Sequence, residues 1–274
     1  MNQLRLVICD IDSTLVTSER KLTPKTKEVI EKLQKHGVYF GIASGRPLDE
    51  ISTYSSEWGF TSPFDVLIGM NGGELWDGIR NETSHYFQLK TEWMKEIMDL
   101  MANFECNPMM YHNGKILCMK NDEMMQRSAK SSKKEVVVAK DRSEFYQEEN
   151  PKLMFRMEKD LMPVVEEYAK AHPSCYYQAF KTQETLLEFA DKRISKAYAL
   201  KKFCDDNAIA LADVAAFGDT TNDNEMIAIS GLGVCMINGS EDTKAIADEI
   251  TEKDNNEDGL AYYLEKKFPD IFQG

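Results

Sequence analysis

The chain has 274 residues, of which 42% are hydrophobic and 29% charged, a balance typical of a globular protein and too apolar for a disordered one. Acidic residues outnumber basic ones by 46 to 33, and the net charge of -13 argues against nucleic acid as a partner, because phosphates are neutralised by lysine and arginine. No apolar run approaches the roughly 20 residues that span a bilayer, and the short apolar stretch before Asp10 is not typical of a signal peptide. We therefore expect a cytoplasmic protein with no membrane partner.

The six cysteines and four histidines predict neither a disulfide framework nor a zinc site. No two cysteines form a Cys-x-x-Cys pair, and most lie in apolar runs, which indicates buried, reduced thiols. The histidines lie far apart in the chain, without the spacing of a zinc-binding helix. A metal site built on histidine or cysteine is therefore not expected.

The first 70 residues alternate between strand and helix patterns. The apolar runs are nearly continuous, as expected for parallel strands that are covered on both faces. Thr23 and Pro24 are typical of the start of a helix and Gly37 of its end, and Pro47 opens another helix. The expected elements are strands at residues 4–10, 38–43 and 65–69, with a helix between each pair. This β-α-β-α-β order predicts a parallel sheet with right-handed crossovers.

Residues 82–188 have a different pattern. Residues 92–104 place their apolar side chains on one stripe of a helix. Asn113-Gly114 lies between two strand-like runs and is a strong signal for a β-hairpin. Further strands are expected at residues 135–139, 152–157, 175–180 and 185–190, and a further helix at residues 161–171. Hairpins with two helices indicate an antiparallel α+β module.

The alternating pattern resumes near Ser195. Helices are expected at residues 196–207 and 222–230, strands at residues 214–217 and 232–236, and an amphipathic helix around Leu260 and Leu264. The sequence therefore predicts one α/β core made of residues 1–81 and 189–274, with residues 82–188 inserted as a separate α+β module.

Four polar clusters share one expected place in this fold, directly after apolar runs. They are Asp10-Ile-Asp12-Ser-Thr14, Ser44-Gly-Arg46, the region of Lys196, and Gly218-Asp219-Thr-Thr-Asn222-Asp223. In an open α/β sheet, ligands bind at the carboxyl ends of the strands. Lys196 fits this place least well because it opens a helix. Each cluster alone is typical of a turn or a helix cap, but together they predict one site.

The acids in these clusters point to a divalent cation. Asp10 and Asp12 are two residues apart at the end of a strand, so alternation directs both side chains the same way. Carboxylates that close repel each other unless a cation or a proton intervenes. Asp219 and Asp223 add two more acids, and oxygen ligands favour Mg²⁺. Ser44 offers a hydroxyl and a following backbone N–H at a helix start, which suits a phosphate.

These motifs resemble those of the haloacid dehalogenase-like phosphatases. Their order and spacing are similar to the Cof-type subgroup, in which a large C2-type cap is inserted between the second and third motifs. The segments Ile68-Gly-Met-Asn71-Gly-Gly73 and Asp258-Gly259-Leu260 also resemble that subgroup. The resemblance covers nearly the whole chain and implies an α/β fold with a Rossmann-like parallel-sheet core and an inserted α+β cap domain.

The resemblance also implies roles for single residues. Asp10 would be the nucleophile and Asp12 the general acid/base. Phosphate would be bound by Ser44, Lys196, Arg46 and Asn222. Magnesium would be held by Asp10, Asp219, the backbone carbonyl of Asp12, and Asp223 as a ligand or a neighbour of the ligands.

Two positions depart from the family pattern. Ser13 stands where the family usually has glycine, and serine is strained there if the backbone φ is positive. Ala197 follows Lys196 where glycine is common, and a helical position tolerates alanine.

The implied activity is Mg²⁺-dependent hydrolysis of phosphomonoesters through an aspartyl-phosphate, with small phosphorylated metabolites such as sugar phosphates as substrates. A phosphomutase or another phosphotransferase would use the same intermediate but pass the group to a second hydroxyl. A non-catalytic phosphoaccepting regulatory domain would gather similar residues around Mg²⁺. Such a domain has no use for Asp12 two residues beyond the nucleophile.

Overall fold

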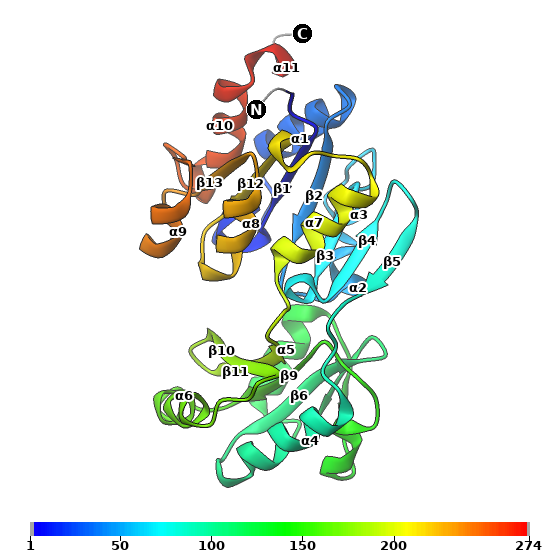
Figure 1. Cartoon of the computed structure of the whole chain (residues 1–274), viewed down its shortest axis with the longest axis vertical. Helices are drawn as coiled ribbons and strands as arrows, with labels where there is room; N and C mark the ends of the chain where they lie inside the picture. The colour runs from blue at the N-terminus through cyan, green and yellow to red at the C-terminus, as the bar shows by residue number, and fades with distance from the viewer. Residues whose placement is uncertain (1–2, 273–274) are drawn as a thin grey trace. The chain divides into compact units, whose positions relative to one another are not determined.

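A computed structural model describes residues 3–272, which divide into two compact units (Figure 1). The first unit comprises Met1–His85 and Ser195–Gly274, and the second comprises Tyr86–Ile194. Each unit has its own sheet. The first part of the core thus ends at His85, and the second part begins at Ser195. The sequence predicts these boundaries at residues 81 and 189.

The first unit is built on an eight-stranded sheet in the order β14-β13-β12-β1-β2-β3-β4-β5. Its strands are β1 (Leu6–Cys9), β2 (Tyr39–Ala43), β3 (Val66–Gly69), β4 (Glu74–Asp77), β5 (Glu82–His85), β12 (Val214–Gly218), β13 (Leu232–Cys235) and β14 (Glu249–Ile250). The strands from β14 to β3 pair in parallel, and β4 and β5 add an antiparallel edge. The predicted parallel-sheet α/β core is confirmed.

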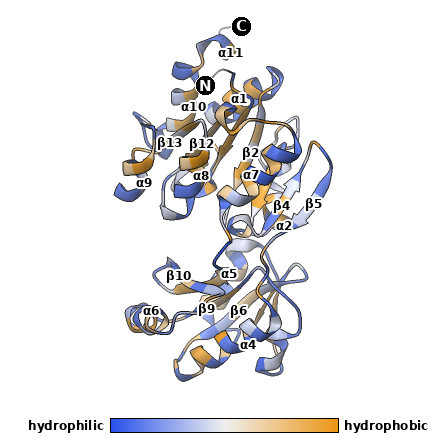
Figure 2. Cartoon of the chain, in the orientation of Figure 1, coloured by the Kyte–Doolittle hydropathy of each residue, from blue (hydrophilic) through white to orange (hydrophobic). Residues whose placement is uncertain are grey.

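Helices cover both faces of this sheet. They are α1 (Pro24–Lys35), α2 (Leu48–Ile51), α3 (Tyr54–Glu57), α7 (Lys196–Asp206), α8 (Asn224–Ile229), α9 (Glu241–Ile246), α10 (Gly259–Lys267) and α11 (Pro269–Phe272). Val7 and Cys9 of β1 belong to one apolar cluster with residues of α1 and α10. Because strand residues alternate between faces, Leu6 and Ile8 point to the other layer, where α7 and α8 contact each other and the strands β3, β12 and β13. Figure 1 shows α7 and α8 in front of the strands, and Figure 2 shows that central strands are hydrophobic.

Several elements of the first unit differ from the sequence prediction. The single helix expected after Pro47 is two short helices, α2 and α3. The helix expected at residues 222–230 begins as a turn and is helical from Asn224. The sequence predicts residues 82–85 to be part of the insertion. In the structure they form the polar strand β5, which pairs with β4 and extends the core sheet. Its pattern lacks the alternation of apolar side chains by which a strand is recognised.

The second unit has a six-stranded sheet in the order β10-β11-β9-β6-β7-β8. Its strands are β6 (Asn107–His112), β7 (Lys115–Cys118), β8 (Val136–Val138), β9 (Lys152–Arg156), β10 (Tyr177–Gln183) and β11 (Leu186–Asp191), and its helices are α4 (Thr91–Leu100), α5 (Glu123–Ser132) and α6 (Met162–Ala171). The predicted hairpin joins β6 and β7, with positive φ at Asn113 and Gly114. The module is not wholly antiparallel, because β8 pairs in parallel with β7. Helix α5, which the sequence prediction missed, supplies the crossover between them.

The cysteines are free thiols, as expected, but Cys175 is exposed and Cys106 half-buried. Within residues 3–272, no helix combines the length and the apolar character that crossing a bilayer requires.

Candidate active site

The carboxyl ends of β1 and β12 bring two aspartates together. These strands are parallel neighbours in which Cys9 lies opposite Phe217, so the residues that follow them, Asp10 and Asp219, lie at one edge of the sheet. The backbone N–H of Asp10 donates to the carbonyl of Phe217 and fixes this register. The structure thus places these two acids side by side, as the strand pattern predicts.

Lys196 is the most deeply buried cation of this cluster, with 1% of its surface exposed. Its Nζ lies 2.6 Å from Oδ1 of Asp10 and 2.6 Å from Oδ1 of Asp223. The side chain of Ser195 caps α7 by accepting the N–H of Tyr198. The lysine therefore enters the site from the first turn of a helix rather than from the end of a strand.

A glycine allows this helix to begin so close to the sheet edge. Gly72 has φ +102°, and a Cβ there would lie 2.0 Å from the carbonyl oxygen of Ser195. Any other residue would push the start of α7 away and would also be strained at that φ. Gly72 therefore fixes the position from which Lys196 reaches the carboxylates.

Asp223 and Asp219 are held in place by local hydrogen bonds. Oδ2 of Asp223 accepts the backbone N–H groups of Asp219 and Thr220 at 3.1 and 3.2 Å. Oδ1 of Asp219 accepts the hydroxyl of Thr14 at 2.9 Å. Asp223 is fully buried and Asp219 half-buried. The turn after β12 therefore presents both carboxylates to the same point.

Two of the three carboxylates, those of Asp10 and Asp219, have raised pKa values. Burial raises the pKa of Asp219 to about 6, and the neighbouring charge of Asp223 adds to this effect. Burial also raises the pKa of Asp10, while Lys196 opposes that rise. The positive charge of Lys196 is stabilised by the two aspartates, which raise its pKa. One lysine does not balance three acids, so the cluster favours a further positive charge.

The donor set fits a divalent cation. Asp10, Asp219 and Asp223 each offer one carboxylate oxygen, and these oxygens all lie within 4.8 Å of one another. Hard oxygen ligands of this kind suit Mg²⁺. The side chain of Asp12 is not in this group, and a metal role for its backbone carbonyl stays a prediction.

Asp12 and Arg46 form a separate pair at the exposed side of the cluster. Nη2 of Arg46 donates to both carboxylate oxygens of Asp12, at 2.8 and 2.6 Å, and the Asp12 side chain is 49% exposed. Nη1 of Arg46 is held by Glu50 at 2.9 Å and by the hydroxyl of Tyr54 at 2.5 Å. Alternation thus fails after Asp10, because the chain leaves the strand there and turns the Asp12 side chain outward.

The backbone at Ser13 has φ 63°, the left-handed conformation that favours glycine. Serine is therefore strained at this position, as the departure from the family pattern predicts. The Ser13 carbonyl accepts the side-chain N–H of Asn238 at 2.9 Å, which helps to hold the loop.

Asn71 links Ser44 and Asn222 by hydrogen bonds to both, and the sequence predicts no role for this residue. The backbone N–H of Asn71 donates to the carbonyl of Ser44, and its Oδ1 accepts the Nδ2 of Asn222 at 3.3 Å. Asn71 is buried, with φ 56°. Asn71 follows a buried strand and is followed by glycine. These two features of the sequence could have indicated that Asn71 lies at the site. Thr14 belongs to the first predicted cluster, but the sequence gives no sign of its hydrogen bond to Asp219.

The chain belongs to the haloacid dehalogenase-like hydrolase family, whose model matches residues 7–264. The expected family is thereby confirmed, and the chain is an enzyme of a hydrolase family. Curated relatives of similar length are named as phosphatases. Two of them are 5-amino-6-(5-phospho-D-ribitylamino)uracil phosphatases of Bacillus subtilis. One is 24% identical over 266 residues, 96% of this chain and 97% of that protein. The other is 28% identical over 264 residues, 94% of this chain and 93% of that protein.

Solved structures share the fold over nearly the whole chain. A haloacid dehalogenase-like hydrolase from Bacteroides thetaiotaomicron has a TM-score of 0.87 at 24% identity, covering 97% of this chain and 100% of that chain. A sugar phosphatase of haloacid dehalogenase subclass IIB has a TM-score of 0.80 at 22% identity, covering 96% and 98%. The α/β fold predicted from the sequence is the fold of these structures.

Proposed function

We propose that the chain is a Mg²⁺-dependent phosphomonoester hydrolase that acts on small phosphorylated metabolites, sugar phosphates among them. The observation that carries the proposal is the meeting of Asp10, Asp219, Asp223 and Lys196 at the carboxyl edge of the sheet. A cytoplasmic location stays a prediction.

Asp10 is the nucleophile of this proposal. One of its carboxylate oxygens attacks phosphorus, the bond from phosphorus to the leaving oxygen breaks, and Asp12 donates a proton to that oxygen. In the second half, Asp12 takes a proton from water, the water oxygen attacks the same phosphorus, and the acyl phosphate bond breaks to free Asp10 and inorganic phosphate. The covalent intermediate divides one difficult step into two.

Lys196 and the phosphate-binding residues offset the repulsion between Asp10 and the anionic substrate. At 4 Å and an effective dielectric of about 20, each pair of like charges costs about 4 kcal/mol. Lys196 contributes a fixed, buried positive charge, and Ser44, Arg46 and Asn222 are proposed to contact the phosphoryl oxygens. When bound by Asp10, Asp219, Asp223 and the Asp12 carbonyl, Mg²⁺ supplies charge stabilisation for the transferring group.

Arg46 gives Asp12 a defined position when no substrate is bound. Its guanidinium contacts Asp12 while Glu50 and Tyr54 hold its other nitrogen. A phosphoryl group that recruits Arg46 would release the Asp12 carboxylate for proton transfer. The pair thereby couples phosphate binding to the availability of the general acid/base.

Hydrolysis of p-nitrophenyl phosphate tests the reaction. We expect steady release of inorganic phosphate that requires Mg²⁺, stops after chelation, and is inhibited by Ca²⁺, whose longer bonds and larger coordination number disturb in-line geometry. A single phosphorylation without turnover would instead indicate a phosphoaccepting domain. Transfer to a second hydroxyl, without free phosphate, would indicate a phosphomutase or another phosphotransferase.

A screen of phosphorylated metabolites then addresses the substrate. It should include sugar phosphates and 5-amino-6-(5-phospho-D-ribitylamino)uracil, the compound for which two curated relatives are named. The proposed substrate class predicts that one or more sugar phosphates is hydrolysed with a higher kcat/KM than p-nitrophenyl phosphate.

A further inference from the structure

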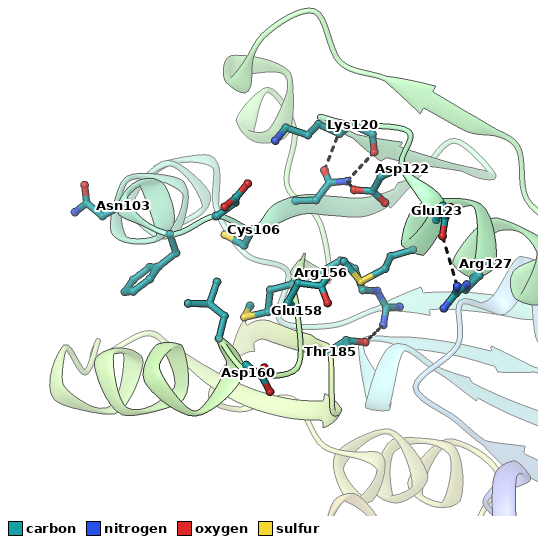
Figure 3. Close-up of a pocket in the computed structure, with 16 residues that line it drawn as sticks. Asn103, Cys106, Lys120, Asp122, Glu123, Arg127, Arg156, Glu158, Asp160 and Thr185 are labelled. Atoms are coloured by element: carbon teal, nitrogen blue, oxygen red, sulfur yellow. Dashed lines mark hydrogen bonds and ion pairs between the residues drawn. The ribbon is translucent and has the colours of Figure 1, made fainter.

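The second unit contains a cavity of about 1000 Å³ that none of the motif residues lines (Figure 3). Its walls come from the connection between α4 and β6, the start of α5, the end of β9 and the β10–β11 hairpin. Because it shares no residue with the candidate active site, an inference about it goes beyond the proposed function.

Arg156 is the feature of this cavity that points to a ligand. Only 8% of its surface is exposed. Its Nη1 donates to Gln183 and Thr185 at 2.8 and 3.0 Å, and its Nη2 donates to Ser128 at 2.9 Å. All three acceptors are neutral. Its Nε is buried and has no hydrogen-bond partner.

Lys152 lies on the same strand as Arg156 and is a buried cation that, unlike Arg156, forms an ion pair. Lys152 and Arg156 are four residues apart in β9, so both point to the same face of the sheet. Nζ of Lys152 lies 2.8 Å from a carboxylate oxygen of Glu188, and both side chains are buried. Among residues 3–272, no carboxylate forms an ion pair with Arg156. A buried cation is costly unless it is paired. Glu188 and Asp122 attract Arg156 without forming a direct ion pair with it, so an anionic group that contacts the guanidinium would stabilise it.

The same cavity is lined by more acids than bases. The acids are Glu105, Asp122, Glu123, Glu158 and Asp160, and the bases are Lys120, Arg127 and Arg156. Figure 3 shows Arg156 in the middle of this group, with Asp122 and Lys120 on one side and Asp160 on the other. A phosphate dianion would meet a net negative wall and is disfavoured.

Some of these acids already have partners and others face the cavity without one. Asp122 caps α5 and also accepts the Nδ2 of Asn107, and Glu123 pairs with Arg127 at 3.6 Å. Glu105, Glu158 and Asp160 are exposed, and none forms an ion pair within the described part of the chain. They offer acceptors for a positively charged donor.

We propose that this cavity binds an amino-acid-like zwitterion, an amino acid or a dipeptide with apolar side chains. The carboxylate of this ligand pairs with the guanidinium of Arg156. A local rearrangement of the Arg156 side chain exposes its Nε, which has no hydrogen-bond partner, to that carboxylate. Its ammonium lies against Glu158 and Asp160. Apolar walls formed by Phe104 and Leu161 cover its side chain.

Calorimetric titration of the full chain with L-leucine and L-leucyl-L-leucine tests the proposal. We expect one or both to bind, and the dipeptide to fill more of the cavity. Leucinamide lacks the carboxylate and N-acetyl-leucine lacks the ammonium, so each should bind at least tenfold more weakly than leucine. Inorganic phosphate should not displace the bound probe. These measurements need no turnover, so they can fail while the proposed hydrolysis succeeds, or succeed while it fails.

Substitutions locate the binding. Arg156→Gln should weaken binding at least tenfold. Because this variant removes a buried group, its fold is checked by circular dichroism. Glu158→Gln combined with Asp160→Asn changes only exposed side chains and should weaken binding several-fold without affecting the fold. Lys159→Gln is the matched control, since this exposed residue lies between the two acids and pairs outward with Glu184.

Three results would overturn the proposal. One is the absence of binding by both probes at millimolar concentration. Another is equal binding of the analogues that lack one charge, and a third is unchanged affinity in the Glu158 and Asp160 double variant. Displacement of the probe by phosphate would indicate a simple oxyanion site and would also count against a zwitterion.

Discussion

Nζ of Lys196 lies 2.6 Å from Oδ1 of Asp10, although the two residues are 186 positions apart in the chain. Between these positions the chain completes the first part of the core and the whole second unit. The contact therefore joins the two halves of the core at the point where the carboxylates converge. It also shows that Lys196 contributes to the fold as well as to the proposed chemistry.

Replacing Lys196 with methionine should destabilise the protein strongly. The substitution leaves Asp10 and Asp223 buried without their common cation, and breaking a buried ion pair costs about 3–5 kcal/mol. Denaturant unfolding at neutral pH, with a chelator present, measures this loss. Adding Mg²⁺ should restore part of it, because a second cation then neutralises the same carboxylates.

Lys201→Met is the matched control for that measurement. Lys201 lies in the same helix and pairs with Asp205 at 2.8 Å, but both side chains are more than half exposed. Exposed pairs contribute less than about 1 kcal/mol. Equal destabilisation by the two variants would contradict the special role of the Lys196 contact.

Asp10→Asn should abolish hydrolysis and leave the fold intact. An amide does not attack phosphorus and is a poorer ligand for Mg²⁺, so turnover of p-nitrophenyl phosphate should fall by at least about 10⁴-fold. The change removes one carboxylate from a group of mutually repelling acids, so the free energy of unfolding should change by no more than about 1 kcal/mol. Substantial activity in a folded Asp10→Asn sample would exclude Asp10 as the nucleophile.

The pKa of Asp219 predicts how Mg²⁺ binding depends on pH. Burial and Asp223 raise this pKa to about 6, whereas an unfolded chain gives about 3.9. Between these values the folded protein keeps a proton that the unfolded chain has lost. As the pH rises through this window, the metal-free folded protein loses this proton and becomes less stable. The contribution of Asp219 to the free energy of unfolding therefore decreases. Mg²⁺ needs the ionised carboxylate, so its affinity should fall by up to about tenfold per pH unit below pH 6.

Thermal unfolding with Mg²⁺ or with a chelator checks this dependence. The increase in Tm caused by Mg²⁺ should be small near pH 5 and should grow as the pH rises through 6 and on toward 8, because burial also raises the pKa of Asp10, another proposed ligand, to about 8. In Asp219→Asn the increase should be smaller at every pH. Glu19→Gln, which changes an exposed acid, should behave like the unmodified protein. An increase in Tm that does not vary with pH would show that protons and Mg²⁺ do not compete at this cluster.

Ser13→Gly should stabilise the protein. The left-handed conformation at φ 63° costs a residue with a Cβ about 1–2 kcal/mol, and the greater freedom of glycine in the unfolded chain offsets about 0.4–1 kcal/mol of that gain. We expect a net increase of about 0.5–1 kcal/mol in the free energy of unfolding. Ser56→Gly in helix α3 should have the opposite sign. A loss of stability in Ser13→Gly would mean that the serine side chain stabilises the loop by more than its backbone strain costs.

The sequence predicts the meeting of Asp10 and Asp219 well, because the ends of neighbouring parallel strands necessarily share an edge. It does not predict the burial of Lys196, which depends on the close approach of Gly72 to Ser195 across a long segment of chain. The outward turn of Asp12 was also missed, since it depends on backbone angles after the strand ends. Helix α5 is not predicted from the sequence, because few of its residues are apolar.

The second unit should determine selectivity more than basal chemistry. The groups proposed to transfer the phosphoryl group all lie in the first unit, and the chain enters the second unit after His85 and leaves it before Ser195. We expect replacement of residues 86–194 by a short flexible linker to lower kcat/KM for the preferred metabolite by about 100-fold or more. The loss for p-nitrophenyl phosphate should be less than about tenfold, because a small aryl leaving group needs few contacts beyond the site itself. The linker must join these points, because β4 and β5 belong to the core sheet. Circular dichroism and cooperative unfolding establish that the shortened chain folds. If that folded chain ranks the metabolites as the whole protein does, selectivity resides in the first unit.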